Sequence, residues 1–236
     1  MQNTMTVARR QFASYFNGPV AYIVMALVLL ALGVFFWQDF FFFRRASVSR
    51  MFDLFPIFLL LAAPALTMGL LAEEKRNGTI ELLLTMPIKD SEVIVGKFLG
   101  VLGVYAVMLV LTLAYPISVS TLGDLDWGQV WAGYFGLFLV GGSMLAIGIM
   151  SSSLTDNQLI SFFVAAAICF TLYIVNRFLP FMPPALATPI EWISLSYHFE
   201  SMGRGVIDSR DLIFFFSLIG VVLLIAFRAL ESRRWK

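Results

Sequence analysis

The chain has 236 residues, of which 60% are hydrophobic and only 13% are charged, and its formal net charge is +1. A soluble protein of this length would carry about a quarter charged residues, so the composition excludes a sizeable soluble domain and gives no indication of nucleic-acid binding. Cys169 is the only cysteine, which excludes an intrachain disulfide.

Long apolar segments dominate the rest of the chain. A helix needs about 20 apolar residues to cross the hydrocarbon core of a membrane. The sequence therefore predicts an all-α polytopic membrane protein that forms a single domain over residues 1–236. The predicted transmembrane helices are Pro19–Gln38, Phe52–Leu71, Val93–Ser118, Val130–Met150, Leu159–Asn176 and Leu212–Phe227.

Lys and Arg predict the orientation of these spans. Six spans place both termini on one side, and that side holds ten of the 16 basic residues. Cytoplasmic loops are enriched in Lys and Arg, so we expect both termini in the cytoplasm. The first span is followed by no small-x-small cleavage pattern, and we interpret it as a retained helix.

Residues 4–17 precede the first span and are amphipathic. Val7 and Phe12 contrast with Arg9 and Arg10, and Gly18 then precedes the first span. This pattern predicts a helix that lies in the membrane interface. A disordered tail is the alternative.

A compact polar segment, residues 73–87, follows the second span. Gly78 is suited to end the preceding helix, and Thr79 can begin a new one with Glu81 in its first turn. Pro87 limits the new helix to about two turns. We interpret it as a short cytoplasmic helix that docks into a groove of a partner protein. The alternative is an ordinary charged loop.

Other features of the middle of the chain are weaker signals. Gly96 and Gly100 form a small-xxx-small pair in the third span, which permits close contact with another helix. The links 121–128 and 151–158 are short and polar, and we expect no site in either.

The segment 180–209, before the last span, predicts an amphipathic helical region at the outer interface. Thr188 and Glu191 form a capping box that predicts a helix over about 189–202. Asp208 and Asp211 are expected to cap the last span. The candidate functional residues of this region are Glu191, Trp192, His198, Phe199 and Arg204.

Catalytic and cofactor chemistry finds little support. His198, the only histidine, has Ser194 and Ser201 on its side of the predicted helix, but no oxyanion-hole motif accompanies them. We expect a role in helix positioning or packing. Gly96 and Lys97 do not end a phosphate loop, and the ligands for a metal site are missing.

Charges inside membrane spans usually mark ion or proton pathways. Here the spans hold essentially none in their interiors, because Asp39, Asp53, Lys97 and Arg177 lie near span ends. This pattern favours transport driven by an external energy source.

The stretch AEEKRNGTIELL at residues 72–83 resembles the coupling segment of ABC-2 type exporter permeases. The stretches YHFES at 197–201, RGVID at 204–208 and LESRRW at 230–235 are similar to the gliding-motility-associated group of these permeases.

This resemblance implies a fold like that of type V ABC exporters, in a bacterial inner membrane. It implies two permease subunits, a second copy or a paralogue, and a homodimeric ATPase that binds ATP, so the chain itself needs no cofactor and is not an enzyme. It also implies an auxiliary subunit with a periplasmic domain. The residues that it assigns to ATPase coupling are Glu73, Glu74, Lys75, Arg76, Gly78, Thr79, Glu81 and Leu82.

Three hypotheses of different classes follow. The first is the permease subunit of an ATP-driven exporter. The second is a structural anchor that transmits mechanical work in an ABC-type complex without moving a solute. The third is an intramembrane hydrolase that uses His198.

Overall fold

The computed structural model describes residues 2–43, 47–79, 89–181, 183 and 190–232. Glu81 and Leu82 of the predicted coupling helix, and Thr188 of the predicted capping box, lie outside these ranges. Every regular element of the described part is helical, which confirms the predicted fold class. These elements are α1 (Gln2–Asn17), α2 (Pro19–Phe43), α3 (Ser49–Thr67), α4 (Gly69–Arg76), α6 (Asp90–Thr112), α7 (Ala114–Ser120), α8 (Trp127–Leu154), α9 (Gln158–Ile174), the 3-10 helix η1 (Val175–Phe181), α11 (Leu195–Gly203) and α12 (Ser209–Glu231).

Six helical segments are long and apolar enough to cross a membrane, and each contains one predicted span. The second segment joins α3 to α4, and the third joins α6 to α7. All six extend beyond the apolar runs, because the helical backbone satisfies its own hydrogen bonds whatever the polarity of the side chains. The segments are Pro19–Phe42, Ser49–Arg76, Asp90–Ser120, Trp127–Leu154, Gln158–Phe178 and Ser209–Glu231.

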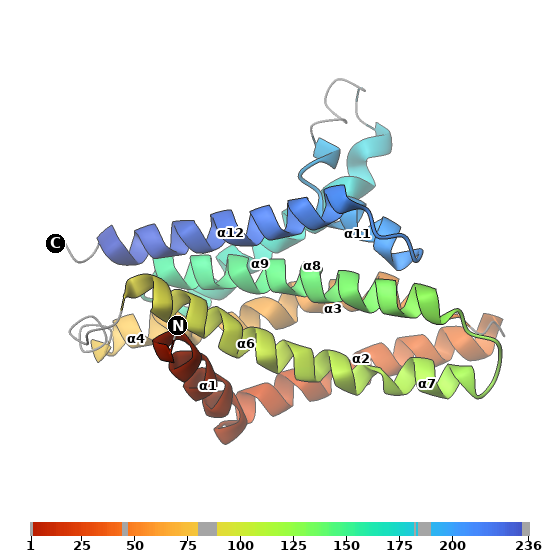
Figure 1. Cartoon of the computed structure of the whole chain (residues 1–236), viewed down its shortest axis with the longest axis horizontal. Coiled ribbons are helices and arrows are strands. Elements are labelled where there is room, and N and C mark those ends of the chain that lie inside the picture. The colour runs from red at the N-terminus through yellow and green to blue at the C-terminus, as the bar shows by residue number, and fades with distance from the viewer. Residues whose placement is uncertain (1, 44–46, 80–88, 182, 184–189, 233–236) are drawn as a thin grey trace.

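The spans run side by side, and α8 lies among the others (Figure 1). It contacts α3, α6, α9 and α12, and 83% of its most apolar window is buried. The corresponding windows of the spans formed by α9 and α12 are each only 17% buried. Helix α8 therefore forms the centre of the core, whereas α9 and α12 turn apolar side chains outward, as a membrane environment permits.

The bundle has two distinct ends (Figure 1). One end holds α1, α4, the start of α6 and the end of α12, and we refer to it as the α4 end. The other holds α7, the start of α8 and α11, and we refer to it as the α11 end. The two termini of the described chain therefore lie at the same end, as an even number of spans requires.

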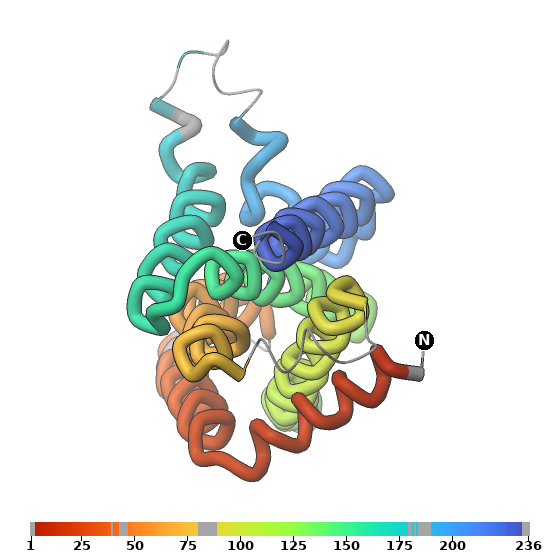
Figure 2. Tube along the Cα trace, turned by 90° about the vertical axis from the view of Figure 1, so that its left-hand side faces the viewer, coloured from red at the N-terminus to blue at the C-terminus, as the bar shows by residue number. Residues whose placement is uncertain are grey.

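Helix α1 confirms the predicted N-terminal helix and crosses α6 before it meets α2 (Figure 2). The crossing uses the predicted small-residue pair. A Cβ atom at Gly96 would lie 2.7 Å from the Cβ of Val7, and one at Gly100 would lie 2.7 Å from the Cβ of Gln11. The close contact that these glycines permit is thus made with α1.

The interpretation of residues 151–158 as a polar link was wrong for its first half. Helix α8 continues to Leu154, and Ser151, Ser152 and Ser153 are all buried. Their hydroxyls bond to backbone carbonyls, for example Ser153 to Met150 at 2.6 Å, so these polar side chains are satisfied inside the protein.

Candidate functional site

Helix α4, which carries the first residues of the predicted coupling segment, is packed into the α4 end of the bundle. It buries Leu70, Leu71 and Ala72, and also Lys75. Contacts from α8 and α6 hold it in place. Because α4 is only eight residues long, its stability depends on these tertiary contacts.

Ser152 on α8 provides hydrogen-bond partners for backbone groups at the start of α4. Its hydroxyl oxygen accepts from the backbone N–H groups of Leu71 and Ala72, each at 3.0 Å, and donates to the carbonyl of Met68 at 2.9 Å. The first N–H groups of a helix have no partner within it. Ser152 therefore acts as an N-cap that comes from a different helix, and it joins α4 to α8.

Lys97 on α6 forms the second connection. Its Nζ donates to the Leu70 carbonyl at 2.6 Å and forms an ion pair with Glu74 Oε1 at 2.7 Å. The interpretation of Lys97 as a charge near a span end missed this burial, since the residue is only 2% exposed. The reason is that α1 and α4 fold over the first turns of α6. A buried ammonium group of this kind requires a charged or carbonyl partner, and α4 provides both.

Lys75 forms the third connection. The side chain is buried, and its Nζ donates to the backbone carbonyl of Ser153 near the end of α8. A backbone carbonyl in the last turn of a helix is a favourable partner for a cation, because it lacks an intrahelical hydrogen bond. Two of the predicted coupling residues, Glu74 and Lys75, thus point into the bundle.

The remaining described coupling residues face outward. Glu73, Arg76, Gly78 and Thr79 are exposed. Gly78 has a φ of +70°, the left-handed conformation that suits glycine at the end of a helix. The Thr79 hydroxyl donates back to the Glu74 carbonyl at 3.2 Å, so it helps to end α4. The helix predicted after Thr79 lies outside the described residues.

Helices α1 and α4 border a hollow of about 430 Å³ next to the Lys97–Glu74 pair. Gln11, Glu73 and Gln158 contribute polar groups to its lining. Tyr15 forms part of the wall, and its hydroxyl donates to the Leu66 carbonyl. Burial raises the pKa of Tyr15, so the hydroxyl stays protonated and remains a donor.

At the α11 end, the predicted continuous helix over 189–202 is wrong. The chain turns at Trp192 and Ile193, and α11 begins at Leu195, with Ser194 as its N-cap. The Ser194 hydroxyl accepts from the Tyr197 N–H, so a local capping bond starts a new helix at this point. As a result Trp192 lies outside α11, whereas His198 and Phe199 lie within it.

The candidate residues of this region accordingly lie in different surroundings. Phe199 is buried in the core, whereas Trp192 is 60% exposed. Glu191 is half buried. Arg204 is exposed and lies 3.8 Å from Glu200, four residues earlier on α11.

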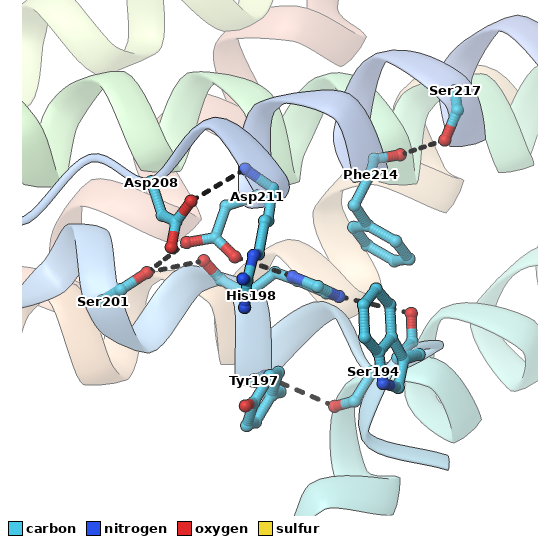
Figure 3. A network of polar contacts seen from close by, with 10 residues as sticks. Ser194, Tyr197, His198, Ser201, Asp208, Asp211, Phe214 and Ser217 are labelled. Atoms are coloured by element: carbon cyan, nitrogen blue, oxygen red, sulfur yellow. Dashed lines mark hydrogen bonds and ion pairs between the residues drawn. The ribbon is translucent and has the colours of Figure 1, made fainter. Parts of the chain in front are cut away.

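His198 joins α11 to α12 in a buried network that we call the His198 clasp, formed by His198, Ser201 and Asp211 (Figure 3). His198 Nδ1 lies 2.7 Å from Asp211 Oδ1, and Nε2 lies 3.2 Å from the Trp192 carbonyl. The ring stacks on Phe214, with centroids 4.0 Å apart. Both ring nitrogens thus face oxygen atoms, one on α12 and one in the segment before α11, so the ring is anchored on two sides.

The clasp corrects one expectation and disfavours another. Asp208 caps α12 as expected by accepting from the Arg210 N–H at 2.9 Å, but Asp211 bonds to α11 instead. The Ser201 hydroxyl contacts the Asp211 carboxylate and, at 3.3 Å, the backbone carbonyl of His198, but not the imidazole, so the carboxylate lies between the serine and the ring. A serine nucleophile needs the imidazole next to it. This order does not suit the hydrolase hypothesis and supports helix positioning.

Comparison with known proteins agrees with this architecture. A family model for ABC-2 family transporter proteins matches residues 3–226, which extend from α1 into the last part of α12. No curated protein matches the chain. The match covers nearly the whole chain, including α4, α11, the first five membrane-crossing segments and most of the sixth. The chain belongs to the ABC-2 family of transporter proteins.

Proposed function

We propose that the chain is the transmembrane permease subunit of an ATP-driven exporter, in which a separate ATPase subunit supplies the energy for substrate movement. In this proposal the protein spans a bacterial inner membrane with its α4 end in the cytoplasm. The excess of Lys and Arg at that end supports the orientation. Both termini then lie on the side where ATP is available.

The observation that carries the proposal is the way α4 is held. Ser152, Lys97 and Lys75 connect it to two membrane-crossing helices, while Glu73 and Arg76 remain exposed. A short helix with polar groups on its outside and fixed connections on its inside can transfer a push from a partner to α6 and α8. A flexible charged loop could not, because it would absorb the displacement.

The partners follow from the same proposal. We propose a homodimeric ABC ATPase at the α4 end and a second permease subunit, a copy of this chain or a paralogue, within the membrane. The stretches at 197–201 and 204–208 support a place in the gliding-motility-associated group, and with it an auxiliary subunit that has a periplasmic domain.

The test uses the tagged full-length chain, purified from its native membranes together with the ATPase that it retains. We expect Glu73→Ala combined with Arg76→Ala to lower the retained ATPase and the stimulated ATP hydrolysis about tenfold, which corresponds to about 1.4 kcal/mol of lost contact energy. The thermal stability of the permease should not change, because both side chains are exposed.

The matched control is Arg228→Ala combined with Glu231→Ala, which removes an exposed pair from the end of α12 at the same end of the bundle. The control should retain the ATPase. If the α4 variant also keeps full binding and full stimulation, then α4 is not the coupling element and the proposal fails.

A further inference from the structure

A polar hollow at the α11 end takes no part in the function proposed above. Its volume is about 430 Å³, and it lies between α3, the start of α8, the end of α9 with η1, and α11. Charged side chains of both signs and aromatic rings share its lining. Those that matter here are Asp53, Arg177, Glu200, Arg204, Phe52 and Tyr173.

The walls of the hollow are fixed in position. Gln129 on α8 donates to the Ser49 hydroxyl at 3.0 Å and to the Gly203 carbonyl at 2.9 Å, so it ties α3 to α11. The His198 clasp holds the opposite side of α11 against α12. The hollow is therefore a preformed feature of the bundle, as binding sites usually are.

Two opposite charges in this hollow, Asp53 and Arg177, make no direct ion pair with each other. In the described part of the chain, neither the Asp53 carboxylate nor the Arg177 guanidinium forms an ion pair or a side-chain hydrogen bond. Both side chains are exposed to the hollow. They lie near enough to interact electrostatically, and Arg50 and Glu200 also act on Asp53.

Asp53 and Arg177 carry opposite charges near the ends of their spans, and both side chains are open to the hollow, so a ligand that enters it can contact both. A ligand with one negative and one positive group would satisfy Arg177 and Asp53 together. Phosphate suits a guanidinium, which binds its oxygens through paired N–H groups. An ammonium group suits the Asp53 carboxylate, and the half-buried Tyr173 also lines the hollow and can contact such a cation.

The surroundings of the hollow indicate where the rest of the ligand lies. Along α9, Phe163 and Phe170 point outward and are 67% and 50% exposed, and Phe178, which follows Arg177, is 54% exposed. This apolar stripe belongs to a membrane-crossing segment and leads to Arg177 at its end. It offers a surface for hydrocarbon chains whose polar end lies in the hollow.

We propose that the hollow between α3, α9 and α11 binds the zwitterionic headgroup of a phospholipid, with its phosphate on Arg177 and its amine on Asp53. The acyl chains lie along the exposed face of α9. The site lies at the opposite end of the bundle from α4 (Figure 1) and shares no residue with the proposed coupling element.

The test is native mass spectrometry of the purified full-length chain after delipidation. The probes are equimolar phosphatidylethanolamine, phosphatidylcholine and phosphatidylglycerol. We expect the protein to retain about ten times more of at least one zwitterionic lipid than of the anionic lipid. A tenfold ratio corresponds to the free energy of about one charge-assisted hydrogen bond. Asp53→Asn should abolish this preference, and Arg177→Gln, which removes the contact to the phosphate that all three lipids carry, should lower the retention of all three.

Asp124→Asn and Arg210→Gln are the matched controls, because both residues are exposed at the α11 end outside the hollow. They should keep the preference. Equal retention of all three lipids by the natural chain would overturn the proposal. So would Asp53 and Arg177 variants that behave like the controls while their melting temperatures are unchanged.

A soluble competitor separates the headgroup from the hydrocarbon. Glycerophosphoethanolamine should displace the bound lipid, and glycerophosphoglycerol, which is also a phosphodiester but lacks the amine, should displace it about tenfold less well. Equal displacement by the two compounds would show that Asp53 recognises no amine and would contradict the proposal. All of these measurements are made without the ATPase. Their outcome therefore tests the lipid site separately from the proposed permease function.

Discussion

Lys97 is the most completely buried charged residue in the described part of the chain. Its position explains how a polar segment is fixed to an apolar bundle. The ammonium group has lost its hydration, and contacts with Glu74 and the Leu70 carbonyl replace the contacts with water. Such a pair contributes less to net stability than to geometry, because both ions lose hydration when it forms. Its main effect is to hold α4 in one place on α6.

We expect Glu74→Gln to destabilise the protein by about 2 kcal/mol, because it leaves the Lys97 charge buried without its ionic partner. This value is below that for a fully enclosed pair, since the Glu74 side chain is 30% exposed. The measurement is thermal or denaturant unfolding in detergent. Glu231→Gln, which breaks an exposed pair with Arg228, should cost less than about 1 kcal/mol. Equal losses of unfolding free energy in the two variants would show that the Lys97–Glu74 pair matters no more to stability than an exposed ion pair.

Asp211 shows how a residue's role depends on its neighbours. Its position in the first turn of α12 suits an acidic group that interacts with the helix dipole. In the fold it bonds instead to His198 and Ser201 of α11. The carboxylate is buried, so these partners replace its hydration.

Asp211→Asn should loosen α11 from α12, because His198 and Ser201 contact different oxygens of the carboxylate and the amide replaces one of these oxygens with an NH2 group. We expect a loss of about 2 kcal/mol and faster amide hydrogen exchange over residues 195–203. Ser217→Ala is the control, since the Ser217 hydroxyl bonds only within α12, to Phe214 at 2.9 Å. Unchanged exchange in α11 of the Asp211 variant would contradict the clasp.

At the scale of elements, α1 is held by contact with α6 as well as by its amphipathic character. The missing side chains of Gly96 and Gly100 allow the two helix backbones to approach. A Cβ at Gly100 would also lie 2.9 Å from the Ala8 carbonyl, a backbone atom that cannot move without the helix.

We expect Gly100→Ala to displace α1 and to destabilise the protein by about 1–3 kcal/mol, the usual cost of overpacking. Gly220→Ala on α12 is the matched control, because a Cβ there meets nothing within 4 Å. The control should be neutral or slightly stabilising, since alanine favours a helix. Cross-linking between cysteines placed in α1 and α6 would report the displacement, and an undisturbed cross-link in Gly100→Ala would count against the close packing.

At the scale of the whole molecule, the bundle separates two ends of different character. The α4 end combines α1, α4 and basic residues, and the α11 end combines the clasp and the polar hollow. Helix α8 connects them, since it bonds to α4 through Ser152 and to α11 through Gln129. A displacement of α4 therefore has a direct mechanical route to the opposite end.

This arrangement gives a topology that single-cysteine labelling can test. Cys169 is buried, and Cys169→Ala provides the background. We expect Arg76→Cys and Ser232→Cys to react with an impermeant thiol reagent from the same side, and Asp124→Cys from the opposite side. Labelling of Asp124→Cys from outside intact cells would support the cytoplasmic α4 end. Reaction of Arg76→Cys and Ser232→Cys from different sides would contradict the six-span fold.

The sequence by itself determined the class of the protein, its spans and the amphipathic N-terminal helix. Apolar runs of membrane length have one structural solution, because an unpaired backbone in lipid is too costly. The left-handed turn at Gly78 was also predictable, since it depends on local backbone chemistry.

Only the tertiary structure decided which polar residues work together. Lys97 and Glu74 are 23 residues apart, Leu71 and Ser152 are 81 apart, and His198 and Asp211 are 13 apart and on different helices. No periodicity records such pairs, because each forms only when separate helices pack. Asp53 and Arg177 are a further example. The sequence shows them only as charges near span ends, whereas in the fold they line one hollow. Helix formation follows from nearby residues, whereas partnership between buried charges follows from the packing that excludes water from them.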